Sequence, residues 1–182
     1  RRKVDLPKAE GGHGGGDGDA QGGDGGNGGA GGSGWGGAIY STGSLTITNC
    51  TFERNQAVGG LAGRGATNGV GAIASILGHG GAGGAASGGA IYSPGFATNV
   101  GCTFAYNLAF SGDSADAGSS REIVNGHDGP DGLGGAMVNR GTNVLVNCTF
   151  YTNRVTAGNG GKGADSGFVG GDGGDGGGAW GG

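Results

Sequence analysis

Three cysteines and three histidines are the side chains of this 182-residue sequence that could act as nucleophiles or metal ligands. They are Cys50, Cys102 and Cys148, and His13, His79 and His127. The histidines all lie among glycines without the spacing of a metal-ligand set, so we expect them to be solvated. The cysteines share one position of a phrase that occurs three times. That placement predicts an interior column of small apolar side chains, not disulfides or reactive thiols.

Acidic glycine-rich segments are the other candidates for chemistry. Residues 170–175 read GGDGGD, which matches the start of a calcium-binding β-roll repeat with Asp172 and Asp175 as carboxylates. Gly177 stands near where the apolar residue of that repeat should follow. We therefore expect no cofactor and no metal site, with calcium as the one alternative.

The composition excludes several classes of protein. Glycine accounts for 55 residues and proline for only 3, without the G-X-Y period of collagen. The formal net charge is -4, and four of the ten basic residues lie within the first eight positions, so no basic stripe is present for nucleic acid. No apolar run approaches the ~20 residues of a membrane span.

The repeated phrase predicts the architecture. Its copies run over residues 36–55, 88–107 and 134–153, and a fourth opening begins at residue 177 and reaches residue 182. Within the first copy Leu45 and Ile47 alternate with threonines, which is the pattern of a half-buried strand. Such short strands would pair with their equivalents in the next copy. We expect an all-β, right-handed parallel β-helix of three to four coils spanning residues 11–182.

Equivalent residues should then stack as ladders along the axis. Phe52, Phe104 and Phe150 are expected to fill the core with the cysteines. Asn55, Asn107 and Asn153 are expected to form a ladder of side-chain amides at a turn. Asn49 and Asn147 also lie at a turn position, and each begins an N-x-T sequon, so both are candidate glycosylation sites.

The GGA[I/M] and F-x-x-N motifs of the three copies resemble the repeats of polymorphic outer-membrane proteins, and more broadly secreted right-handed parallel β-helix proteins. The two motifs together cover about 60 residues of the chain. The resemblance implies an extracellular or cell-surface location and a passenger that is often adhesive. The chain departs from that pattern in its long glycine-rich spacers.

These spacers follow a period of three residues, as in the sequence QGGDGGNGGAGGS at residues 21–33. A polyproline-II helix has three residues per turn, so the period suits an ordered bundle of such helices. The alternative is a solvated, flexible loop.

An enzymatic β-helix would need paired carboxylates on one face. The outward positions expected on the first strand of the copies hold none. They instead include Phe96, Val100, Val144 and Val146, which predicts an apolar contact face. The alternative is that the glycine spacers of the same chain cover this face. We therefore expect no enzymatic activity.

The two ends suggest self-association. Residues 1–10 belong to no copy of the phrase, and we expect them to form an extended arm that donates a strand to the next subunit. The residues expected at that contact are Val4, Leu6 and Trp180. The expected function is thus a non-enzymatic extracellular structural protein that polymerises head to tail. The alternatives are a surface adhesin that binds a glycan or host-surface ligand, and a piece of a longer solenoid.

Overall fold

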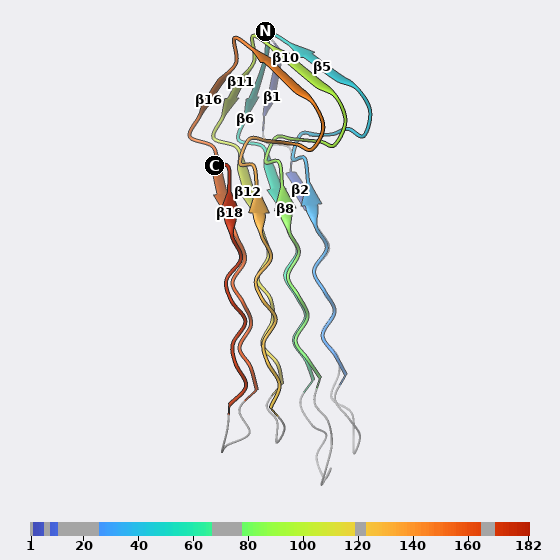
Figure 1. Cartoon of the computed structure of the whole chain (residues 1–182), viewed down its shortest axis with the longest axis vertical. Helices are drawn as coiled ribbons and strands as arrows, with labels where there is room; N and C mark the ends of the chain where they lie inside the picture. Colours follow the sequence, from blue (N-terminus) through green and yellow to red (C-terminus); the bar gives the residue numbers. More distant parts are fainter. Residues whose placement is uncertain (1, 6–7, 11–25, 67–77, 119–122, 165–169) are drawn as a thin grey trace.

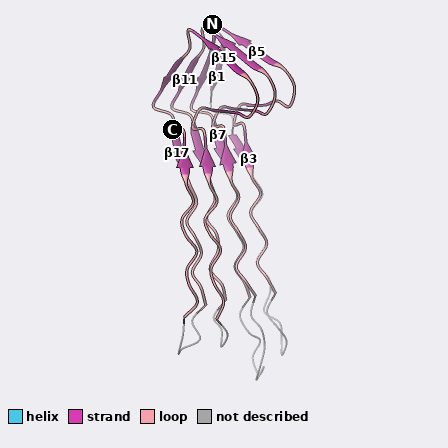
Figure 2. Ribbon diagram, viewed as in Figure 1, coloured by secondary structure: helices cyan, strands magenta, loops and turns pink. Residues whose placement is uncertain are grey.

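The computed structural model describes residues 2–5, 8–10, 26–66, 78–118, 123–164 and 170–182. Within these ranges the chain is all-β, with strands β1 to β18 and no helix. The strands gather at one end of the molecule, which we call the head (Figures 1 and 2). Long segments without assigned secondary structure extend away from the head, and we call these the legs (Figure 2).

Each of three successive repeats supplies one strand to each of five parallel sheets. Repeat 1 comprises β3 Gly34–Trp35, β4 Ile39–Tyr40, β5 Leu45–Thr48, β6 Cys50–Glu53 and β7 Gln56–Val58. Repeat 2 comprises β8 Ala86–Ser87, β9 Ile91–Ser93, β10 Ala97–Val100, β11 Thr103–Ala105 and β12 Leu108–Phe110. Repeat 3 comprises β13 Gly132–Leu133, β14 Met137–Asn139, β15 Asn143–Val146, β16 Thr149–Tyr151 and β17 Arg154–Thr156. Parallel pairing of equivalent strands is consistent with the predicted β-solenoid.

Three further strands extend the stack beyond these repeats. They are β1 Arg2–Asp5, β2 Lys8–Glu10 and β18 Ala179–Trp180. Strand β1 pairs with β6 and β2 pairs with β7, so both lie on the repeat-1 side. Strand β18 pairs with β13 on the repeat-3 side. Residues 1–10 belong to no copy of the repeated phrase, and within them β1 and β2 continue two strand columns of their own chain.

Left-handed turns separate the strands and hold them in register. The expected turn between β5 and β6 is present, since Asn49 has a φ of 51°. Gly101 and Asn147 hold the same position with φ values of 63° and 52°. The first glycine of the GGA motif is also left-handed, with φ 62° at Gly36. Asparagine and glycine are the residues that tolerate this conformation best, which explains why they recur at these positions.

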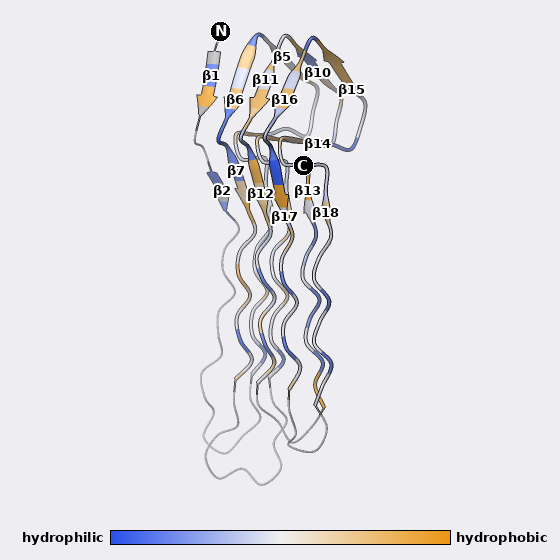
Figure 3. Ribbon diagram, turned by 90° about the vertical axis from the view of Figure 1, so that its left-hand side faces the viewer, coloured by the Kyte–Doolittle hydropathy of each residue, from blue (hydrophilic) through white to orange (hydrophobic). Residues whose placement is uncertain are grey.

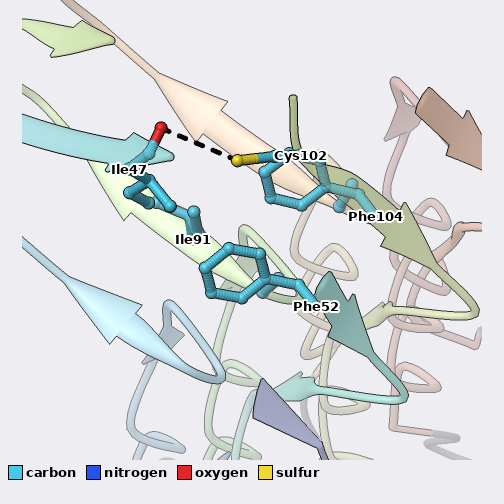
Figure 4. Close-up of a cluster of buried hydrophobic side chains, with 7 residues drawn as sticks. Ile47, Phe52, Ile91, Cys102 and Phe104 are labelled. Carbon is cyan, nitrogen blue, oxygen red and sulfur yellow. Dashed lines mark hydrogen bonds between the residues drawn. The ribbon is translucent and has the colours of Figure 1, made fainter. Parts of the chain in front are cut away.

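The core of the head is a thin column between the sheets. Ile47, Phe52, Ile91, Cys102 and Phe104 are buried in it (Figure 4). Hydrophobic residues are concentrated in the strands of the head, whereas the legs are mainly neutral or hydrophilic (Figure 3). The small glycine and alanine residues that open each repeat let the sheets approach closely. A chain this poor in large side chains can therefore still exclude water layer by layer.

The legs are ordered and bonded to one another at a period of three residues. The described legs are leg 1 (26–33), leg 2 (59–66), leg 3 (78–85), leg 4 (111–118), leg 5 (123–131), leg 6 (157–164) and leg 7 (171–178). Between legs 1 and 2, Gly60 N–H donates to the Gly32 carbonyl and Gly63 N–H to the Gly29 carbonyl, both at 2.8 Å. This period is that of a polyproline-II helix, and it favours the ordered alternative over the flexible loop.

Candidate interaction surfaces

The phenylalanine column shows where the core meets solvent. Phe52, Phe104 and Phe150 stack with ring centroids 5.0 and 4.7 Å apart. Phe52 and Phe104 are 1% and 0% exposed, whereas Phe150 is 42% exposed. The change follows from position, because Phe52 lies between β1 and β11, while no described strand follows β16. An inward-facing aromatic ring is thus left open at the repeat-3 side.

The cysteine column lies beside the phenylalanines, and all three thiols are free. Cys102 is buried in the core cluster, and Cys50 and Cys148 pack against it from the neighbouring repeats. The Cys102 Sγ lies 3.7 Å from the Ile47 carbonyl oxygen (Figure 4). Burial raises the pKa of the Cys102 thiol above its ordinary value. This side chain is therefore placed as a small core residue and not as a nucleophile.

The asparagine column forms a continuous hydrogen-bonded ladder. Asn107 Oδ1 accepts from both the backbone N–H and the Nδ2 of Asn55, at 3.0 and 2.7 Å. Asn107 in turn donates through its N–H and Nδ2 to Asn153 Oδ1, at 3.0 and 2.9 Å. Its Nδ2 also reaches the Phe52 carbonyl at 3.1 Å. These bonds give partners to buried backbone N–H and carbonyl groups at the turn. The residue before each asparagine is left-handed, as Tyr106 is with a φ of 54°.

The repeat-3 edge exposes residues at inward positions of the core. We use this name for the open side of β14, β15, β16 and β17. Leu145 occupies the inward position that Ile47 and Asn99 hold in the preceding repeats, and its exposure is 46% against 7% and 0%. Leu145, Phe150 and Met137 line a hollow of about 350 Å³ together with residues 181 and 182. The edge therefore combines apolar side chains with an unpaired strand backbone.

The opposite side, which we call the repeat-1 edge, is partly covered by β1. Val4 pairs in register with Phe52 and packs against the core cluster. Strand β1 pairs with β6 of its own chain and has no described strand on its other side, so the contact of Val4 with another chain stays a prediction. Leu6 lies outside the described residues. Beside β1, strands β4 and β5 have no described strand before them.

Trp180, the third residue expected at a contact, lies on β18 at the end of the column formed by Trp35, Ser87 and Leu133. Its side chain is 63% exposed. It lines an open hollow of about 600 Å³ with Leu133, Val138 and Arg140. Trp180 therefore remains available for contact with another molecule.

The expected contact face lies on the outer side of the sheet β5-β10-β15. Val100 pairs with Val146, and Thr98 pairs with Val144, so the outward positions are aligned as predicted. Phe96, Val144 and Val146 are exposed, and Val100 is half-buried. The legs extend away from the head and leave this face open (Figure 1). The described legs therefore do not cover this face.

The Asp and Asn residues in the legs have a role that was not predicted from the sequence. At six positions of the described legs, the Oδ1 atom accepts the backbone N–H of the equivalent residue one repeat later. Asn27 accepts from His79 at 2.8 Å, Asn125 from Asp172 at 3.0 Å and Asp128 from Asp175 at 2.9 Å. Where the third residue of a GGx triplet is Asn or Asp, its side chain supplies the acceptor for an N–H of the next repeat. The period-three recurrence of Asp and Asn was the signal in the sequence.

Two buried serines were also missed. The Ser114 hydroxyl accepts the Gly83 N–H at 3.0 Å and donates to the Asp128 carbonyl at 2.7 Å. Ser111 bridges Ala86 and Asp131 in the same way, at 2.9 and 2.8 Å. Leg 4 thus places hydroxyls between legs 3 and 5. Nothing in the local sequence distinguishes these serines from solvated loop residues.

The remaining predicted sites are placed as follows. Asn49 and Asn147, the candidate glycosylation sites, are exposed. His79 and His127 are exposed on the legs, and His13 lies outside the described residues. Across the described part of the chain, no three His, Cys, Asp or Glu side chains form a group that could hold a metal ion. No described helix is long and apolar enough to cross a membrane.

Comparison with known proteins gives no match to a family model, to a curated protein or to a solved structure. The resemblance to polymorphic outer-membrane repeats therefore stays a prediction.

Proposed function

We propose that this chain is a non-enzymatic structural protein of the cell exterior, folded as a right-handed parallel β-helix that associates end to end. The observation that carries the proposal is the exposure of inward-facing Leu145 and Phe150 on the repeat-3 edge. Large apolar groups on an unpaired strand edge favour strand addition. A contact between two different surfaces of one chain does not close on itself, so it produces a linear polymer.

A second copy is the occupant that suits this edge best. The repeat-1 edge presents strands of the same direction, spacing and residue columns as those at the repeat-3 edge. Val4 would continue the phenylalanine column beyond Phe150, just as it precedes Phe52 within its own chain. The self-complementary columns therefore supply a ready partner, and no second protein is needed.

The test is the assembly state of the purified 182-residue chain. We expect sedimentation velocity and negative-stain microscopy to show linear polymers whose length grows with concentration. Phe150→Asp should raise the concentration needed for assembly at least tenfold, because a carboxylate would be buried in the joint. Phe96→Asp is the matched control on the outer face and should assemble normally. A chain that remains monomeric, or a Phe150→Asp variant that assembles as the wild type does, would contradict the proposal.

A second candidate function is adhesion through the outer face of β10 and β15. The exposure of Phe96, Val144 and Val146 favours it. Here a panel of polysaccharides and cell surfaces would be screened for binding. Loss of binding in Phe96→Asp but not in Phe150→Asp would assign adhesion to this face, and the reverse pattern would remove it.

A further inference from the structure

The two tryptophans of the chain stand at the two ends of one residue column. Trp35 lies on β3 and Trp180 on β18, and register pairing through β8 and β13 connects them. The sequence contains only these 2 tryptophans. They are 45% and 63% exposed. This column carries its largest side chains at its two open ends. One end of the column is therefore suited to contact the opposite end of the same column in a second copy.

The repeat-1 end of this column already carries a stack of parallel rings. Trp35 lies 5.9 Å from Tyr40 and 5.5 Å from Tyr92, with interplanar angles of 14° and 15°. Tyr40 and Tyr92 stack on each other at 5.6 Å. Tyr92 is nearly buried, whereas Tyr40 is half exposed. The rings of Trp35 and Tyr40 therefore offer surface to a further ring.

At the repeat-3 end, the Trp180 ring lies beside an open hollow and could be this further ring. The hollow next to Trp180 is bounded by Leu133, Met137, Val138 and Arg140. Val138 holds the position that Tyr92 and Tyr40 occupy in repeats 2 and 1. At this position the repeat-3 end thus has an aliphatic side chain, whereas the repeat-1 end has stacked rings.

One displacement continues three of the five strand columns, while the columns that end at β14 and β15 have no strand at the fourth place. A second copy moved by four places along the stack brings its β3 beside β18. The same movement brings its β1 beside β16 and its β2 beside β17. In that register β18 of the first copy and β1 and β2 of the second occupy different columns, so they do not collide. Four strand spacings of about 4.8 Å give an axial rise of roughly 19 Å per copy.

The legs carry hydrogen-bonding groups in the same register. Asp172 and Asp175 are the last residues of two columns in the legs, and the first residues of these columns are Asn27 and Ala30. No hydrogen bond within the described part of the chain uses the backbone N–H of Asn27 or Ala30, or the carboxylates of Asp172 and Asp175 as acceptors. In a second copy displaced by four places, those N–H groups would face those carboxylates. A charged acceptor strengthens each such bond.

We propose that Trp180 of one copy packs against Trp35 and Tyr40 of the next, with Asp172 and Asp175 accepting the backbone N–H groups of Asn27 and Ala30. This inference rests on the end-to-end assembly proposed above and specifies its joint. The partner is a second copy of this chain in a single register. Assembly should therefore bury the exposed face of Trp180.

Single-tryptophan variants test the joint. In Trp35→Phe, Trp180 is the only indole, and we expect its emission to shift to shorter wavelength on assembly. Its quenching by acrylamide should fall severalfold between dilute monomer and sedimented polymer. Trp180→Ala should raise the concentration needed for assembly at least tenfold. Tyr106→Ala, which removes an exposed ring away from both edges, is the control and should leave assembly unchanged.

The outcomes separate this inference from the proposed function. Polymers in which Trp180 stays open to acrylamide, or in which Trp180→Ala assembles normally, would overturn the tryptophan joint and leave the structural function standing. A chain that stays monomeric at every concentration would overturn both. Circular dichroism of each variant checks that the head is folded, so a loss of assembly cannot come from unfolding.

Discussion

The asparagine ladder shows how one residue type can stabilise the whole head. Asn107 is fully buried, and its side chain bonds to both neighbouring repeats at once. The residue before it is left-handed and is not glycine. Such a conformation persists only where surrounding bonds determine it. The ladder is therefore the local reason that tyrosine and arginine can occupy this turn.

Replacing Asn107 with alanine should destabilise the protein by about 2–4 kcal/mol. The change leaves the Asn55 N–H and the Phe52 carbonyl buried without partners, and each such group costs about 1–3 kcal/mol. Asn153→Ala should cost less, because Asn153 is only half-buried at the repeat-3 edge. Urea unfolding followed by circular dichroism measures both. Equal losses, or a larger loss for Asn153→Ala, would show that burial of the ladder is not the source of its contribution.

The legs are elements whose packing depends on the absence of side chains. A Cβ added to Gly84 would overlap the Gly32 carbonyl and lie 2.9 Å from the Gly60 nitrogen. The same glycine also donates its N–H to the Gly60 carbonyl at 2.9 Å. The hydrogen bonds between legs therefore form only where the legs approach so closely that a side chain would not fit. The GGx triplet allows this approach by placing glycine on the two sides that face other legs and a polar residue on the outside.

Gly84→Ala should therefore destabilise the leg bundle by about 1–3 kcal/mol, the usual cost of overpacking. Gly176→Ala is the matched control, since a Cβ at Gly176 meets no atom within 4 Å. The control should be neutral or slightly stabilising, because alanine restricts the unfolded chain. Hydrogen exchange of the leg amides, read by mass spectrometry, should rise in Gly84→Ala and stay unchanged in Gly176→Ala. Equal exchange in the two variants would refute the packing argument.

At the scale of the whole molecule, the head and the legs present their repeats along one common axis. The strand columns of the head and the residue columns of the legs both place equivalent residues of successive repeats side by side. Examples are the pairs Ala97–Asn143 in the head and Asn125–Asp172 in the legs. A second copy that continues one set of columns must therefore continue the other. This shared axis explains why the contacts proposed at the head and at the legs agree on one register.

Fibre diffraction or electron microscopy of assembled material should show this register as an axial repeat. We expect a meridional spacing of roughly 19 Å for one copy, together with a reflection near 4.8 Å for the strand spacing. Polymers of the Phe96→Asp control should give the same spacings. Fibres with only the 4.8 Å reflection and no longer repeat would contradict the single register.

Features that depend on local periodicity could be predicted from the amino-acid sequence alone. The alternation around Leu45 and Ile47, the recurrence of Asn55 and the left-handed positions at Asn49 and Gly101 were enough to predict parallel strands and stacked ladders. These features follow from sterics and from the two-residue period of a strand, which are properties of the chain itself. The glycine period suited ordered legs but left the flexible loop open as an alternative, and it did not identify the role of Asn125 or Asp128.

Features that depend on neighbours far apart in the sequence became visible only in the folded chain. Val4 covers the core of its own chain because β1 has the register of β6, which no local pattern in residues 1–10 reveals. Ser114 is buried because legs 3 and 5 lie on either side of it. Phe150 is exposed although Phe52 and Phe104, at equivalent positions, are buried. Burial is a property of the assembled layers, so identical phrases acquire different roles according to where the stack places them.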